Sequence, residues 1–125
     1  MSARTDTNPK DLLGIKKCPL RYVPCALKIT AAPAMAEGAR KYGPYNWRQK
    51  KVQYSIYLEA IERHLNALID GQDADPATGI HHESSIAANI AIVTDARAMG
   101  CLIDDRSGTG AAPILLAEQD KSNAS

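Results

Sequence analysis

The sequence lacks the features that mark secreted and membrane proteins. Its three cysteines, Cys18, Cys25 and Cys101, are an odd number without a C-x-x-C pair, so they predict neither a disulfide framework nor a zinc ribbon. The first eleven residues carry no apolar signal segment, and the most apolar run, residues 86–93, is short and interrupted by Asn89. We therefore expect a protein of the reducing cytoplasm that does not contact a membrane.

An excess of charge of one sign is also missing. The 15 Lys and Arg residues balance 14 Asp and Glu residues, which leaves a formal net charge of +1. Such a chain has no overall field that would hold nucleic acid, so any anion must be bound by locally placed charges. The length of 125 residues predicts one domain over residues 1–125.

Aromatic residues are scarce, with no Phe, five Tyr and one Trp, but they are not evenly spread. Two of the tyrosines and the tryptophan lie in residues 41–48. Aromatic rings stack on bases or sugars, Asn pairs with a base edge, and Lys and Arg neutralise phosphates, so the segment predicts a nucleotide pocket. The alternative is a loop whose aromatic side chains plug the end of a helical core. The candidate substrate-binding residues of this segment are Lys41, Tyr42, Asn46, Trp47 and Arg48.

Helical periodicity dominates the centre of the chain. Apolar residues recur at three- and four-residue spacing over residues 52–69, which predicts a long helix that ends at Gly71. A second long helix, apolar on nearly every face, is predicted over residues 83–99. A turn-rich loop joins them. The sequence therefore predicts an all-α helical bundle built on a long antiparallel helix pair.

The ends of the chain break this pattern. Three prolines in residues 1–29 predict an extended N-terminal arm. Thr30 is expected to cap a short helix that stops at Gly43. Residues 107–125 predict a loosely ordered tail. Because so small a domain can hardly cover an all-round apolar helix, we expect a homodimer or homotetramer.

Carboxylates on the two long helices are the candidates for metal binding. Glu59 and Glu62 lie three residues apart on one side of the first helix and could share a hard divalent cation, although solvated helix faces often carry such pairs. Antiparallel packing would bring Glu59 level with Asp95, and His64 level with Asn89.

Each of these residues also has a structural interpretation. Arg63 could reach a phosphate or pair with an acidic residue one turn away. His64 and Asn89 could bind substrate or be satisfied core residues. Asp95 could lie at the surface or form an ion pair with Arg97 or Arg106.

Taken together, several motifs resemble those of the phage and bacterial dATP/dGTP diphosphohydrolase family. The matching segments are Asn8-Pro9-Lys10-Asp11, Lys41-Tyr42-Gly43, Asn46-Trp47-Arg48, Arg63-His64-Leu65, Gly71-x-Asp73-x-Asp75-Pro76 and Asp104-Asp105-Arg106. The resemblance covers about residues 8 to 107. It implies a single domain similar to the MazG-like all-α nucleotide pyrophosphatases, which oligomerise and use Mg²⁺ or Mn²⁺. The implied reaction cleaves a purine (deoxy)nucleoside triphosphate, dGTP or dATP, to the monophosphate, and a phage-encoded member would act in the host cytoplasm.

The resemblance also implies a set of metal ligands, which is incomplete in this chain. Glu59 and Glu62 fill an E-x-x-E half, and either could orient the attacking water. The second half, an E-x-x-D pattern, is incomplete because Ile86 stands three residues after Glu83, and His82 with Ser85 could occupy its position. The family commonly has Glu where this chain has Gln72. The implied ligands are Glu59, Glu62, Asp95, His82 and Glu83. A non-catalytic nucleotide-binding or helical interaction module remains the alternative.

Overall fold

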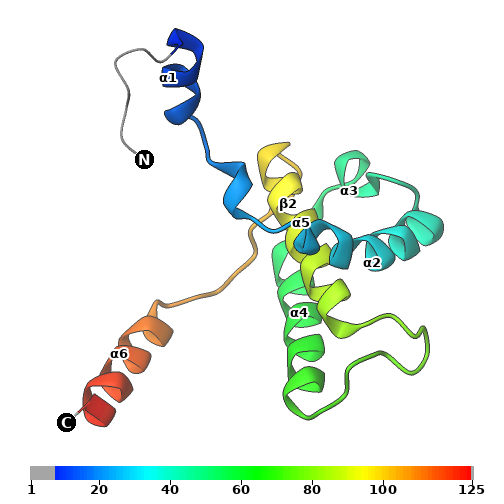
Figure 1. The fold of residues 1–125 in the computed structure, drawn as a ribbon. Coiled ribbons are helices and arrows are strands. Elements are labelled where there is room, and N and C mark those ends of the chain that lie inside the picture. The colour runs from blue at the N-terminus through cyan, green and yellow to red at the C-terminus, as the bar shows by residue number, and fades with distance from the viewer. Residues whose placement is uncertain (1–7, 125) are drawn as a thin grey trace.

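The computed structural model describes residues 8–124, and nearly all of their regular structure is helical (Figure 1). The predicted all-α class is confirmed. Two strands of two residues each are the exception among the described residues. In chain order the elements are α1 (Pro9–Ile15), a 3-10 turn (Leu20–Tyr22), α2 (Ala26–Tyr42), α3 (Asn46–Gln49), β1 (Val52–Gln53), α4 (Tyr54–Ile69), α5 (His82–Ala98), β2 (Leu102–Ile103) and α6 (Ala111–Ala124).

The helix α5 is the centre of the fold. It packs against α2 on one side and α4 on another, and it also contacts α3 and β2. Its buried side chains are mostly small, with Val93 and Ala96 almost inaccessible to solvent, and small side chains let neighbouring helices approach closely. The helices α4 and α5 run in opposite directions (Figure 1), as the periodicity predicts.

The apolar spacing over residues 52–69 predicts Leu65 on the inner face of α4, but the structure places His64 there. Leu65 is 46% exposed, whereas its neighbour His64 is half-buried. With 3.6 residues per turn, either position can follow Ile61 on the inner face, and here the helix turns His64 inward. This rotation brings a titratable side chain into the packed centre.

The helix α2 begins five residues earlier than predicted, at Ala26, and Thr30 is not its cap. Pro33 consequently lies inside the helix rather than in its first turn. Beside it, the N–H of Ala34 donates a hydrogen bond of 3.0 Å to the Oγ of Ser84, which is 2% exposed. The C-terminal end agrees with the prediction, because Gly43 ends α2 with φ +90°, a conformation that favours glycine.

The ends of the chain correct two sequence predictions. Residues 1–7 of the predicted arm lie outside the described residues. Residues 9–15 form α1 rather than an extended segment, because Asn8 caps the helix by accepting a hydrogen bond from the N–H of Lys10 and Pro9 occupies the first turn. The predicted loose tail instead contains α6. Both helices lie away from α2–α5 (Figure 1), and their described side chains are exposed.

The short strands join the start of α4 to the segment that follows α5. They pair in parallel, with Val52 opposite Leu102. Just beyond β2, the carboxylate of Asp105 accepts hydrogen bonds from the backbone N–H and the hydroxyl of Ser55 in the first turn of α4. No helix of the described residues is long and apolar enough to span a membrane.

Candidate active site

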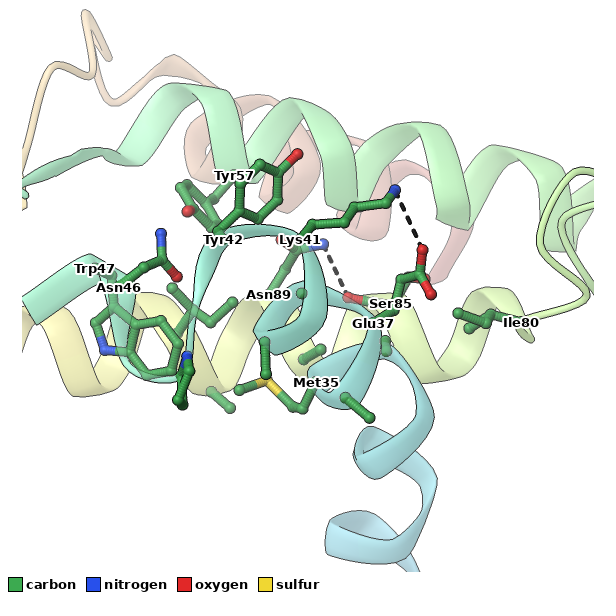
Figure 2. Close-up of a pocket in the computed structure, with 18 of the residues that line it drawn as sticks. Met35, Glu37, Lys41, Tyr42, Asn46, Trp47, Tyr57, Ile80, Ser85 and Asn89 are labelled. Carbon is green, nitrogen blue, oxygen red and sulfur yellow. Dashed lines mark hydrogen bonds and ion pairs between the residues drawn. The ribbon is translucent and has the colours of Figure 1, made fainter.

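A cavity of about 710 Å³ lies between α2, α4 and α5 (Figure 2). This volume falls in the range of about 300–1,000 Å³ that is typical of small-molecule sites. The C-terminal half of α2 and the aromatic segment form one wall, and α4 and α5 form the others. The loop between α4 and α5 closes one end. Of the predicted substrate-binding residues, those that line the cavity are Lys41, Tyr42, Asn46, Trp47, His64 and Asn89.

Trp47 anchors one end of the cavity. It is 6% exposed, and its indole Nε1–H donates a hydrogen bond of 2.6 Å to Oδ2 of Asp95. The same carboxylate accepts two hydrogen bonds from Arg48, at 2.8 and 2.7 Å, and the Arg48 guanidinium lies 4.4 Å from the centroid of the Tyr45 ring. The side chains of α3 thus attach the aromatic segment to α5. Trp47 has the structural role that the alternative interpretation gave it and also forms part of the cavity wall.

This cluster corrects the sequence interpretation of Asp95 and Arg48. Hydrogen bonds from Arg48, and next from Trp47, lower the pKa of Asp95 to about 2, so the carboxylate is ionised and bonded to both side chains where it lines the cavity. It does not join Glu59 in a metal site. Arg48, in turn, has its guanidinium occupied by Asp95 and does not line the cavity, so it is not available to a phosphate in the way that the sequence predicted.

The cavity mouth carries a cation beside two phenols. The Nζ of Lys41 lies 3.3 Å from Oε1 of Glu37, and the Lys41 side chain is half-exposed. Tyr42 and Tyr57 lie close together, one from α2 and one from α4 (Figure 2). Burial, with a smaller effect of Tyr42, raises the pKa of Tyr57, so its phenol is neutral near pH 7. A charged group can therefore meet a lysine next to flat aromatic surfaces.

Asn89 supplies polar atoms on the α5 side of the cavity (Figure 2). Its Nδ2 donates a hydrogen bond of 2.8 Å to the backbone oxygen of Ser85, one turn earlier. Its Oδ1 has no hydrogen-bond partner among residues 8–124. Because none of the described buried side-chain atoms lacks a partner, this oxygen must be accessible. Asn89 thus offers an acceptor to a ligand.

His64 and His82 lie closer together than the predicted register allowed. Their Nδ1 atoms are 2.8 Å apart, and Nε2 of His82 lies 2.8 Å from Oε1 of Gln72. His82 is only 5% exposed, and hydrogen bonds occupy both of its ring nitrogens, so it has no nitrogen free for the metal that the sequence assigned to it. Burial, and next the neighbouring His82, lower the pKa of His64.

The other predicted metal ligands do not lie close to one another at the cavity. Glu59 and Glu62 are exposed on α4 and do not line the cavity, and the same holds for the candidate phosphate ligand Arg63. Glu83 is exposed beside a separate hollow of about 340 Å³. Within residues 8–124, no group of three or more His, Cys, Asp or Glu side chains could hold a metal ion. The predicted five-residue set therefore does not form one site within a single chain.

Two carboxylates that the sequence interpretation left unassigned do line the cavity, Glu37 and Asp75. Glu37 precedes Lys41 by one helical turn, a spacing that predicts an ion pair but does not reveal a cavity. Asp75 lies in the loop after α4, where its Oδ1 accepts a hydrogen bond from the N–H of Ala77. Within this loop, the N–H of Asp75 donates a hydrogen bond of 2.9 Å to the backbone oxygen of Ile80, which also lines the cavity.

Comparison with known proteins gives a family for this arrangement. Residues 7–106 match the family model described as dATP/dGTP diphosphohydrolase, N-terminal. A protein of Salmonella phage PMBT28 named dATP/dGTP diphosphohydrolase is 30% identical over 106 residues, which cover 82% of this chain and 36% of that relative. The chain thus spans about a third of the relative's length. No solved structure matches. The match over most of its length shows that the chain belongs to the dATP/dGTP diphosphohydrolase family, in the part that the N-terminal family model describes.

Proposed function

We propose that this chain binds a purine deoxynucleoside triphosphate, dGTP or dATP, in the cavity and hydrolyses it to the monophosphate. The observation that carries the proposal is the combination, in one cavity, of a half-exposed lysine, neutral aromatic side chains and an accessible amide. Family membership supports the same substrate class, because the phage relative is named for it.

Each wall of the cavity suits a different part of a nucleotide. Tyr42, Tyr57 and the ring of Trp47 offer surfaces on which a base or sugar can stack. Asn46 and Asn89 offer amides to a base edge. Lys41 offers a positive charge to the phosphates. Without a nucleotide, the ammonium group of Lys41 forms an ion pair with Glu37. Cavity side chains would bind and orient the substrate, which lowers the barrier by proximity.

Dependence on Mg²⁺ or Mn²⁺ is also a proposal, and the predicted ligand set does not support it within one chain. Mg²⁺ commonly takes only one or two carboxylates from a protein and completes its shell with water and substrate phosphates. Glu37 and Asp75, which line the cavity, are the residues that would meet a cation carried by a triphosphate. Bound there, the cation would neutralise phosphate charge.

Chromatography of reaction products tests the function directly. The chain would be incubated with dGTP, dATP, GTP, dCTP and dTTP, with Mg²⁺, with Mn²⁺ and with a chelator. We expect deoxynucleoside monophosphate and pyrophosphate from the purine deoxynucleotides, and little product from the pyrimidines. As a matched pair, Lys41→Gln should weaken turnover of every nucleotide, whereas Lys51→Gln, which removes an exposed lysine outside the cavity, should not.

A second candidate function has its own support. The lysine, aromatic rings and amides that line the cavity can hold a nucleotide without a metal-ligand group of protein side chains, so a nucleotide-binding module without catalytic activity also fits. Calorimetric titration with dGTP separates the two functions. Binding without any product would favour the module, and absence of binding would contradict both.

A further inference from the structure

Three side chains beside the cavity form a hydrogen-bonded row that the proposed substrate contacts do not use. The row begins at Gln72 in the loop after α4, passes through His82 at the start of α5, and ends at His64 on the inner face of α4. Both hydrogen bonds measure 2.8 Å. His82 is buried, whereas His64 lines the cavity, so the row leads from the protein interior to the site where a ligand would bind.

The row fixes where the ring protons lie. The Oε1 of Gln72 can only accept, so Nε2 of His82 must donate to it. In the neutral ring, Nδ1 of His82 then has a lone pair and must accept a hydrogen bond from Nδ1 of His64. His64 is thereby held with its proton on Nδ1 and a lone pair on Nε2.

His64 lines the cavity, and its Nε2 keeps a lone pair that no described residue binds. This atom has no hydrogen-bond partner among the described residues, and because none of their buried polar side-chain atoms lacks a partner, it must be accessible. Three groups act electrostatically on the ring: Asp75 in the loop, His82 on α5 and Arg63, the preceding residue on α4. Asp75, which lines the same cavity, favours a positive charge on His64, and the other two oppose it.

We propose that His64 is the base that accepts a proton from the attacking water, and that Gln72 and His82 are positioning residues that hold His64 in the required tautomer. This inference rests on the proposed hydrolysis. In the step, the water oxygen forms a bond to phosphorus while its proton moves to Nε2 of His64. The bond from phosphorus to the bridging oxygen breaks, and the departing phosphate group keeps the electron pair. His64 then releases its proton to solvent, and the neutral ring is restored.

The tautomers can be measured without any activity. In ¹⁵N-labelled protein, long-range ¹H–¹⁵N correlation spectra report which nitrogen of each imidazole carries the proton. The chain has three histidines, and the exposed His81 serves as an internal reference. We expect the proton on Nε2 of His82 and on Nδ1 of His64. The opposite arrangement, with the proton of His64 on Nε2, would overturn the proposal.

Kinetics then separates positioning from packing. His64→Gln should lower kcat by about 10²-fold or more, the usual contribution of a general base. Gln72→Ala frees the His82 ring to reverse its tautomer and should lower kcat at little change in KM. Gln72→Glu should restore most of that loss, because a carboxylate also accepts from His82. His81→Gln, at the exposed neighbouring position, is the control and should change neither value.

The outcomes distinguish this inference from the function on which it rests. If the unaltered protein hydrolyses no nucleotide, the proposed function fails, and with it the role of His64 as base, while the spectra still decide whether the row orders the protons. If the unaltered protein is active and folded His64→Gln retains near-normal kcat, hydrolysis stands and the base is another group.

Discussion

Asp95 shows how a single residue can be engaged in holding the fold together. Its carboxylate accepts hydrogen bonds from the indole of Trp47 and from two nitrogens of Arg48. These contacts join the short helix α3 to the central helix α5, and so they hold the aromatic segment against the cavity. A residue on an apolar helix that the sequence offered as a metal ligand is therefore an anchor for the cavity wall.

The lowered pKa of Asp95 gives a pH dependence with a definite sign. Its pKa falls from an ordinary 3.8 to about 2 in the folded chain, so its contribution to stability is complete above about pH 4 and is lost as the pH falls toward 2. We expect Asp95→Asn to lower the melting temperature near pH 7. The difference from the unaltered protein should shrink as the pH falls from 4 to about 2. A difference that is independent of pH would show that the carboxylate charge is not what matters.

Glu59 is the residue on which the sequence and the structure differ most. It is exposed on α4, lies outside the cavity and forms no hydrogen bond or ion pair with any residue of the described part. We therefore expect Glu59→Gln to change turnover by less than about tenfold, since it removes no transition-state contact. Steady-state kinetics checks this, with Glu62→Gln as a companion. A loss of about 10²-fold in either variant would return the α4 carboxylates to the mechanism.

At the scale of elements, the contact between α2 and α5 depends on a buried hydroxyl. Ser84 accepts a hydrogen bond from the N–H of Ala34, next to the proline inside α2. We expect Ser84→Ala to lower the free energy of unfolding by about 1–3 kcal/mol, because it leaves a backbone donor without its partner. Ser85→Ala is the control, because that hydroxyl has no partner among the described residues. Denaturant titration compares them, and equal stabilities would show that the bond contributes nothing.

The elements also show which sequence signals were reliable. The long helices, the loop between them and the stop at Gly43 follow from apolar periodicity and from glycine, and the structure has all of them. The helix α1 was missed because the three prolines of residues 1–29 were interpreted as marks of an extended arm, whereas Asn8 and Pro9 start a helix in the structure. The inward turn of His64 in place of Leu65 could not be predicted, because helical spacing permits either residue.

On the scale of the whole molecule, six of the eight predicted substrate-binding residues line one cavity. Local composition could find the aromatic segment because its residues are adjacent in the chain. The predicted metal site depended on a helix register that placed His64 level with Asn89. The contact between His64 and His82 shows that α4 and α5 pack in a different register, which local composition does not reveal. Glu37 and Asp75 line the cavity because of how α2 and the loop after α4 pack, which helical spacing does not reveal, although Asp75 belongs to a motif of the family.

The exposed apolar side chains bear on assembly. On the two long helices these include Ile56, Leu65, Ile69 and Ile90, each at least 46% exposed. Large apolar side chains exposed on the long helices could be covered by a second copy of the chain, so we expect a homodimer or homotetramer. Light scattering at micromolar concentration measures the mass, and Leu65→Lys should shift it toward the monomer. A monomeric unaltered protein would contradict this expectation.

Occupation of the cavity by nucleotide is the central claim, and the fluorescence of Trp47 measures it most directly. Trp47 is the only tryptophan of the chain and lines the cavity, so its emission reports events there. Titration with a non-hydrolysable dGTP analogue should change the emission in a saturable way, with the same dissociation constant that calorimetry gives. Lys41→Gln should raise that constant and leave the emission change at saturation intact. Calorimetric binding with no change in Trp47 emission would place the nucleotide elsewhere and contradict the account.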